Sequence, residues 1–160
     1  MMNVTLLCVG KLKESYYKDA FAEYRKRLGA FCRFTLEEIS ERRLPEDPSK
    51  AEIAAALAAE AAEIEKRIPK GALLAAFCIE GEPLTSEGFS VRLHSWAAEG
   101  KSAVCFLIGG SFGLDEGLKR RADARFSLSG MTFPHHLFRV MAAEQIYRAF
   151  TIGAGMKYHK

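Results

Sequence analysis

The sequence predicts a single α/β domain with a mainly parallel sheet flanked by helices. Short apolar runs rich in β-formers alternate with amphipathic helical stretches along the whole chain. One run, 103–108, is continuously apolar, as expected of a central strand covered on both faces. The chain has 160 residues and is 49% hydrophobic, which allows one sizeable core but is short for two. We therefore expect residues 1–160 to form one domain.

The first third of the chain is predicted to be strand, helix, strand and loop. Residues 3–9 and 34–39 are the strands. The helix between them has apolar residues at helical spacing and a glycine suited to its end, namely Tyr17, Phe21, Tyr24 and Leu28, followed by Gly29. The charged segment 40–48 contains two prolines, so we expect a solvated loop.

A capping signal marks the next helix. Ser49 and Glu52 have the spacing of a capping box, and Pro69 ends the segment. The expected buried stripe of this helix is Ile53, Leu57, Ile64 and Ile68. Its glutamates are interpreted as the solvated face.

The second half continues the alternation. A strand at 72–79 leads into a predicted turn at 81–83, and a helix with Phe89, Leu93 and Trp96 on one side runs to Gly100. Strand 103–108 is followed by a short helix at 115–121 and a strand at 125–129. A final helix is expected over 135–150, before a short tail.

Composition narrows the class of protein. The start of the chain lacks a signal-peptide pattern and no apolar run approaches the roughly 20 residues that span a bilayer, so we expect a cytoplasmic protein with no membrane partner. The net charge of +3 lies entirely in the second half and is mild, so an RNA partner would be recognised largely by shape or by a preformed pocket. Four isolated cysteines are interpreted as reduced core thiols, with no spacing for a metal: Cys8, Cys32, Cys78 and Cys105.

Candidate ligand-binding positions lie where strands end, because ligands of open α/β sheets sit beyond the carboxyl ends of the strands. Three junctions stand out, at 77–81, 108–113 and 128–135. Gly109 and Gly110 would let the backbone approach a ligand closely, although a tight turn alone also explains them. Neither a phosphate loop nor a dinucleotide fingerprint is present, which favours a nucleoside without phosphates.

Charged residues on the apolar final helix need partners. Glu144 and Arg148 are four residues apart and are expected to pair with each other. Arg139 has no such local partner, so it is a candidate binder of an anion or a carbonyl group. His135, behind Pro134 at the helix start, is a weak signal when taken alone.

The chain resembles the RlmH family of SPOUT-class methyltransferases over essentially its whole length. The block Thr132-Phe133-Pro134-His135 with Arg139, combined with the end Tyr158-His159-Lys160, carries much of the resemblance. Further matching segments are 8–14, 23–24, 27–28, 107–110, 113–114, 127–129, 131–135 and 144–149.

The resemblance implies a SPOUT fold with a C-terminal deep trefoil knot, an exception to the rule that chains do not knot. It implies a homodimer that binds S-adenosyl-L-methionine as methyl donor in the knot, with the partner subunit closing the site. Donor-binding positions carried over are Phe77, Gly109, Leu128, Ser129, Gly130, Met131, Thr132 and Phe133. The family usually has leucine where Phe77 stands, and Gly130 occupies a variable position.

The implied reaction is methylation of N3 of a pseudouridine in 23S rRNA of the assembled ribosome. N3 must lose its proton, and negative charge develops on the flanking carbonyl oxygens. We expect His159 to accept or position the proton, Arg139 to stabilise the charge, and Tyr158 and His135 to orient the base. No metal is expected, since the sulfonium is already an activated leaving group.

Two other classes of function stay open on the sequence. A nonenzymatic ribosome- or RNA-binding factor would keep the fold and lose the donor site. An unrelated α/β nucleotide enzyme, for instance a small hydrolase, is the weaker alternative, because the chain has no G-x-S-x-G elbow, no phosphate loop and no obvious Ser/His/Asp arrangement.

Overall fold

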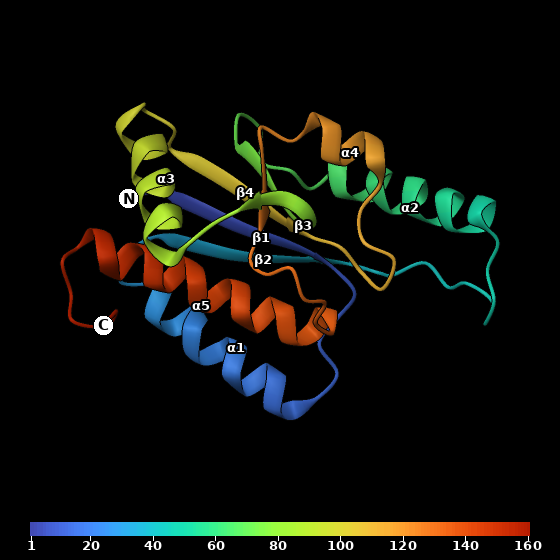
Figure 1. Ribbon diagram of the computed structural model, residues 1–160, viewed down its shortest axis with the longest axis horizontal. Coiled ribbons are helices and arrows are strands. Elements are labelled where there is room, and N and C mark those ends of the chain that lie inside the picture. The colour runs from blue at the N-terminus through green and yellow to red at the C-terminus, as the bar shows by residue number, and fades with distance from the viewer.

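The computed structural model describes residues 1–160 and confirms the predicted α/β class (Figure 1). Five strands form one sheet in the order β2-β1-β4-β3-β5, and every neighbouring pair is parallel. The strands are β1 (Asn3–Val9), β2 (Arg33–Ile39), β3 (Leu73–Pro83), β4 (Ala103–Ile108) and β5 (Ala124–Ser127). The continuously apolar run is thus an interior strand, β4, as its composition predicts.

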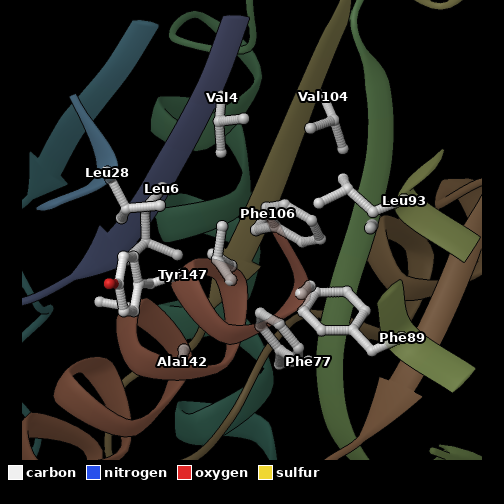
Figure 2. Close-up of a cluster of buried hydrophobic side chains, with 14 of the residues drawn as sticks. Val4, Leu6, Leu28, Phe77, Phe89, Leu93, Val104, Phe106, Ala142 and Tyr147 are labelled. Atoms are coloured by element: carbon white, nitrogen blue, oxygen red, sulfur yellow. The ribbon is translucent and has the colours of Figure 1, made fainter. Parts of the chain in front are cut away.

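Helices cover both faces of the sheet (Figure 1). On one face lie α1 (Ser15–Leu28), α3 (Ser86–Ala98) and α5 (His135–Gly153), and on the other lie α2 (Lys50–Glu65) and α4 (Glu116–Arg121). Side chains of β1 alternate between the two layers: Leu6 packs in the first core and Leu7 in the second. Figure 2 shows the larger core, where α5 packs under β1 and β4.

Phenylalanines fill the part of this core nearest the carboxyl ends of the strands. The ring of Phe77 on β3 stacks on that of Phe106 on β4, with centroids 5.5 Å apart. It also meets the ring of Phe138 on α5 edge-on at 5.8 Å (Figure 2 labels Phe77 and Phe106). Such aromatic pairs add about 0.5–1.5 kcal/mol beyond the burial of their area. They fix the first turn of α5 against the sheet.

Local signals account for several helix starts. The capping box of α2 is present: the Ser49 hydroxyl accepts from the backbone N–H of Glu52, and the Glu52 carboxylate accepts from the backbone N–H of Ser49. Thr85 and Asp115 cap α3 and α4 in the same way, through their side-chain oxygens. Each cap satisfies a backbone donor that the helix itself leaves free.

The predicted turn at 81–83 is wrong, because these residues belong to β3. The register of β3 against β5 shifts between Phe77 and Glu82, which marks a bulge. Gly81 lies so close to the neighbouring strand that a Cβ atom would stand 2.6 Å from the carbonyl carbon of Phe126. The glycine therefore serves a close approach of two backbones and not a reversal of the chain.

The ends of some elements and the exposure of side chains on α2 also differ from expectation. Strand β5 ends at Ser127 and α5 continues to Gly153. In α2 only Ile64 of the predicted stripe is fully buried, and Glu60, interpreted as solvated, is 5% exposed. The Glu60 carboxylate accepts a hydrogen bond from the backbone N–H of Arg42, 3.0 Å away, which explains how an acidic residue is accommodated there.

Candidate functional site

A cavity of about 720 Å³ lies at the carboxyl ends of β4 and β5 and beside the bulge of β3, within the range of small-molecule sites. The three segments singled out in the sequence all contribute to its wall, although the first of them lies within β3 and not at its end. It is lined by residues 77–80, 108–114, 127–129 and 131–135, together with Lys119 and Phe138. Parallel strands bring these junctions together because their carboxyl ends meet at one edge of the sheet.

Glycines shape the loop after β4. The Gly113 backbone N–H donates to the carbonyl of Gly110 at 3.1 Å, and Gly113 has a φ of +81°, which favours glycine. A Cβ atom on Gly109 would overlap the backbone of Gly113. The loop is therefore a tight turn whose backbone atoms, unshielded by side chains, face the cavity.

The loop between β5 and α5 is braced by its own serines. The Ser127 hydroxyl donates to the carbonyl of Ser129 at 2.9 Å, and the Ser129 hydroxyl accepts from the backbone N–H of Met131 at 3.0 Å. Of the predicted donor-binding residues in this loop, Leu128, Ser129, Met131, Thr132 and Phe133 line the cavity together with Phe77 and Gly109. Gly130 does not line it, and a Cβ atom added to Gly130 would meet no other atom within 4 Å.

Few charges face the cavity. Among the lining residues only Glu80, Lys119 and His135 bring acidic or basic side chains. The Lys119 ammonium donates to the carboxylates of Glu80 and Glu116. Burial lowers the pKa of Lys119, but its bonds to Glu116 and Glu80 outweigh burial and leave the pKa above its usual value. The wall thus offers no unpaired cluster of cations that would suit a phosphate group.

His135 stands at the rim, at the first position of α5. Burial is the main cause that lowers its pKa, and the neighbouring His136 adds to the effect. Its ring lies 4.3 Å from that of His136, centroid to centroid, and its Nε2 is 3.9 Å from the Glu41 carboxylate. His136 in turn meets the Glu14 carboxylate at 3.2 Å.

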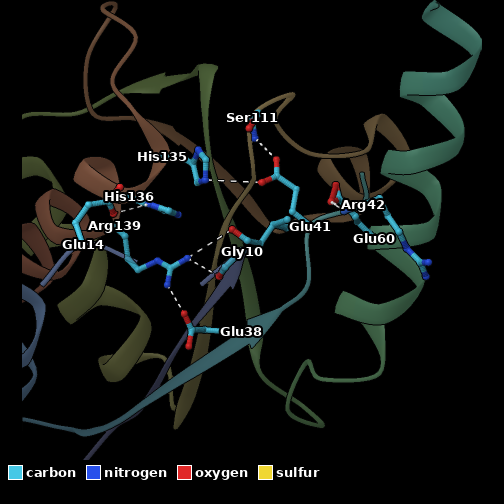
Figure 3. Close-up of polar contacts among 11 residues, drawn as sticks. Gly10, Glu14, Glu38, Glu41, Arg42, Glu60, Ser111, His135, His136 and Arg139 are labelled. Carbon is cyan, nitrogen blue, oxygen red and sulfur yellow. Dashed lines mark hydrogen bonds and ion pairs between the residues drawn. The ribbon is translucent and has the colours of Figure 1, made fainter. Parts of the chain in front are cut away.

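Arg139 is not unpaired, so that expectation is corrected. Its guanidinium is 1% exposed and lies 2.5 Å from the carboxylate of Glu38 on β2 (Figure 3). It also donates to the carbonyl of Gly10 at 2.8 Å. The partner is 101 residues away along the chain, which is why local spacing could not reveal it. Arg139 does not line the cavity.

The C-terminal tail packs at the far end of α5. The Tyr158 hydroxyl donates to Glu144 at 3.0 Å, and burial is the main cause that raises its pKa. His159 lies between Glu87, 2.7 Å from its Nε2, and Arg148, 3.1 Å from its Nδ1. The predicted pairing of Glu144 with Arg148 is confirmed at 2.5 Å.

The tail and the cavity are separated along α5. From His135 to Arg148 the helix rises about 20 Å at 1.5 Å per residue. Neither Tyr158 nor His159 lines the cavity. Figure 1 shows the C-terminus on the same side of the molecule as the N-terminus, where the strands begin. One copy of the chain therefore does not bring the predicted catalytic tail to the predicted donor site.

Several residues of the cavity went unnoticed in the sequence. Lys119 and Phe138 line it, and Glu41 contacts its glycine loop. Cys78 and Glu80 also line it, and both belong to the segment 77–81 that the sequence singled out. Nothing in the local pattern marks Lys119 or Glu41.

The cysteines, possible metal ligands and helix lengths also bear on the expectations from the sequence. All four cysteines are free, and burial raises the pKa of the thiols of Cys8, Cys32 and Cys105 to about 12. This confirms them as inert core thiols, whereas Cys78 is only partly buried. No group of three or more His, Cys, Asp or Glu side chains is placed to hold a metal ion. No helix has the length and apolar character to cross a bilayer.

Known proteins resemble this chain along its full length. The family model described as predicted SPOUT methyltransferase matches residues 2–159. A ribosomal RNA large subunit methyltransferase H of Bifidobacterium animalis subsp. lactis (strain AD011) is 46% identical over 159 residues, covering 99% of this chain and 100% of that protein. The protein of the same name from Streptococcus pyogenes serotype M5 (strain Manfredo) is 45% identical with the same coverage.

Solved structures agree on the fold. A probable methylase family protein of Haemophilus influenzae Rd KW20 superposes with a TM-score of 0.56 at 12% identity, covering 99% of this chain and 71% of that one. A probable methyltransferase of Bordetella pertussis Tohama I gives 0.54 at 14% identity, with coverages of 93% and 96%. With the family model and the relatives above, the five-stranded parallel sheet and its cavity identify the chain as a member of the SPOUT methyltransferase family.

Proposed function

We propose that this chain transfers a methyl group from S-adenosyl-L-methionine to N3 of a pseudouridine in 23S rRNA of the assembled ribosome, in the cytoplasm. Membership of a methyltransferase family and 45–46% identity to ribosomal RNA large subunit methyltransferases support the reaction class. The choice of nucleotide and of the assembled ribosome rests on the resemblance in the sequence.

The observation that carries the proposal is the glycine-walled cavity with few charges at the carboxyl edge of the sheet. The cavity fits a methyl donor that contains a nucleoside. Backbone N–H and C=O groups are exposed around Gly109 for hydrogen bonds, and Phe77 and Leu128 supply apolar walls. The residues that would hold the donor are Phe77, Gly109, Leu128, Ser129, Met131, Thr132 and Phe133. When bound, the donor supplies a methyl group activated by its sulfonium.

The deep trefoil knot belongs to the same proposal. The chain from β4 through the 128–134 loop to α5 supplies both the cavity wall and the core helix, which is the part that the family resemblance assigns to the knot. A knotted path would hold these loops in one arrangement without any bound ligand.

We further propose that the active enzyme is a homodimer whose tail residues act at the cavity of the partner. The separation of the tail from the cavity within one chain supports this, since a second copy is the simplest source of a tail at that edge. Closed two-fold dimers are also the commonest oligomers of soluble proteins. The Glu87–His159 contact holds the tail in a defined place on its own subunit.

Both ring nitrogens of His159 are engaged within its own subunit, so the acceptance of the N3 proton stays a prediction and requires release of Arg148 from Nδ1. Because an arginine can only donate, the contact with Arg148 makes Nδ1 of His159 the acceptor and leaves the proton on Nε2, which donates to Glu87. The Glu87 carboxylate, which accepts from Nε2, orients the ring. The Tyr158 hydroxyl donates to Glu144, so its donation to a base carbonyl requires release of that hydrogen bond. His135 lines the cavity, which supports the role of orienting the base that we propose for it.

The role proposed for Arg139 requires a rearrangement. Its guanidinium is engaged by Glu38 and by the Gly10 carbonyl, away from the cavity wall. Direct stabilisation of charge on the base stays a prediction, and it requires release of Glu38.

The test is methyl transfer from radiolabelled S-adenosyl-L-methionine to ribosomes that lack the modification, with free 23S rRNA alongside and the labelled nucleotide mapped. Label at N3 of one pseudouridine in assembled ribosomes is the expected result. Donor binding measured by titration calorimetry, without transfer to either substrate, would point to another RNA acceptor. Absence of donor binding would favour a nonenzymatic RNA-binding factor.

A further inference from the structure

Glu41 lies just outside the donor cavity and contacts two segments of its wall. Its Oε1 accepts a hydrogen bond from the backbone N–H of Ser111, 2.7 Å away, in the glycine loop after β4 (Figure 3). Its Oε2 is 3.9 Å from Nε2 of His135 at the start of α5. One carboxylate therefore forms a hydrogen bond with one part of the cavity wall and lies near a second part from another element, with which it forms an ion pair when His135 is protonated.

The fit around this carboxylate is tight. A Cβ atom on Gly110 would lie 2.5 Å from Oε1 of Glu41, and one on Gly10 would lie 3.8 Å from Oε2. Gly110 thus leaves the space that the carboxylate occupies, whereas a Cβ atom on Gly10 would be in ordinary van der Waals contact with it. The side chain is 31% exposed, so the carboxylate keeps partial contact with solvent.

The backbone that carries Glu41 is itself held in place. The next residue, Arg42, donates its backbone N–H to the Glu60 carboxylate on α2, and Glu60 is 5% exposed. On the other side, β2 ends at Ile39, whose carbonyl accepts from the N–H of Gly10 at 2.8 Å. The carboxylate of Glu41 is therefore presented from a fixed position between β2 and α2.

We infer that Glu41 is a positioning residue of the donor site, which holds the 109–113 loop against the start of α5. The inference rests on the proposed function, in which this cavity binds S-adenosyl-L-methionine. Glu41 acts through the Ser111 amide and the His135 ring and contacts no donor atom. A glutamine at this position has the same shape without the charge, so it keeps the hydrogen bond from the Ser111 N–H and removes the negative charge near the His135 ring.

The charges around His135 set the expected response to pH. The ring faces Glu41 from the 40–48 loop, His136 and Arg139 from α5, and Glu14 from the segment before α1. Glu41 and Glu14 favour the protonated ring, whereas burial, His136 and Arg139 oppose it. Removing the negative charge of Glu41 must therefore lower the pKa of His135 further.

Two variants separate the two contacts, with a matched control in the same loop. Glu41→Gln keeps an amide oxygen for the Ser111 N–H, and Glu41→Ala removes both contacts. Glu46→Ala is the control, because Glu46 is exposed and makes no hydrogen bond or ion pair. The readouts are amide hydrogen exchange of Ser111 in the donor-free protein, the Kd for S-adenosyl-L-methionine, and the pKa of His135 by NMR titration.

Glu41→Ala is expected to speed exchange at Ser111 and to weaken donor binding about tenfold, as expected for loss of one charge-assisted hydrogen bond. Glu41→Gln is expected to bind the donor within about threefold of wild type while the pKa of His135 falls. Rescue of binding by the amide, together with the shift of the His135 pKa, is a pattern that loss of fold would not produce.

The inference is overturned if Glu41→Ala matches Glu46→Ala in both Ser111 exchange and donor Kd. It is equally overturned if Glu41→Gln leaves the pKa of His135 unchanged and binds the donor as poorly as Glu41→Ala. A wild-type protein that binds no donor would refute the proposed function instead, and exchange at Ser111 would still decide whether Glu41 holds the loop. If Glu41→Ala does not fold, the Glu41→Gln readouts decide.

Discussion

Replacing Gly109 by alanine tests whether the loop after β4 holds the methyl donor. The added methyl group would overlap the backbone of Gly113, and the neighbouring Gly110 is closed in by Glu41. The 109–113 turn must therefore open by moving Gly113 away. Its hydrogen bond from the Gly113 N–H to the Gly110 carbonyl, 3.1 Å long, is then lost or lengthened.

The expected size of the effect follows from these two changes. Forcing an extra methyl group into a packed site costs about 1–3 kcal/mol. Loss of the turn's hydrogen bond adds about 0.5–1.5 kcal/mol. Together they amount to roughly 2–4 kcal/mol, and at 1.4 kcal/mol per factor of ten the Kd for the donor should rise by about 30- to 1000-fold, if binding must restore the closed turn.

Titration calorimetry with S-adenosyl-L-methionine measures this directly. Gly130→Ala is the matched control, because Gly130 lies in the neighbouring wall loop but does not line the cavity and has open space around it. That variant should bind within about threefold of wild type. Donor affinity of Gly109→Ala equal to that of the control, in a protein with unchanged thermal unfolding, would refute the assignment of this loop to the donor.

Three further predictions concern stability, reactivity and pH. Arg139→Ala should lower the free energy of unfolding by about 3 kcal/mol, because it leaves the Glu38 carboxylate without its partner. Lys66→Ala, which removes an exposed ion pair with Glu63, should lower it by about 1 kcal/mol or less. Denaturant unfolding of the two variants measures this difference. In the native protein at pH 8, iodoacetamide should modify Cys78 alone, and bound S-adenosyl-L-methionine should slow that reaction because Cys78 lines the cavity. Mass spectrometry would follow the modification of each cysteine. Faster reaction of another thiol, or no protection by S-adenosyl-L-methionine, would contradict this prediction. Burial raises the pKa of Glu60 above its unfolded value, so the folded state holds a proton more tightly and stability should fall as pH rises from about 4.5 through the folded pKa. Glu60→Gln should remove that fall, and identical pH dependence in both proteins would be the contrary result.

The regular elements were accessible from the sequence because their causes are local. Apolar runs predicted β1 and β4, and the Ser49–Glu52 spacing predicted the start of α2. Gly81 shows the limit of such reasoning. A Gly-Glu-Pro segment is typical of a turn, but here the glycine allows β3 to approach Phe126 on β5. The sequence around Gly81 does not indicate that Phe126 lies next to it.

In the candidate site, too, some features could be predicted from the sequence and others depend on contacts between distant residues. Most of its wall could be predicted because strand ends of a parallel sheet converge, and the resemblance supplied the donor-binding positions within it. The polar contacts behind the wall could not, because they join distant parts of the chain. Glu38 meets Arg139 across 101 residues and Glu41 meets Ser111 across 70. The position of His159, away from the cavity within one chain, also depends on tertiary packing alone.

The central claim is that the cavity of one chain works with the tail of another. Mixing two variants, at a donor concentration that saturates wild type but lies far below the Kd of Gly109→Ala so that each variant alone is inactive, tests it most directly. Gly109→Ala would supply an intact tail with a damaged donor cavity, and His159→Ala an intact cavity with a damaged tail. After dissociation and reassociation at equal amounts, half of the dimers are mixed and each has one complete site, so methyl transfer to ribosomes should recover to about a quarter of the wild-type rate. A mixture as inactive as its two components would contradict a site shared between subunits.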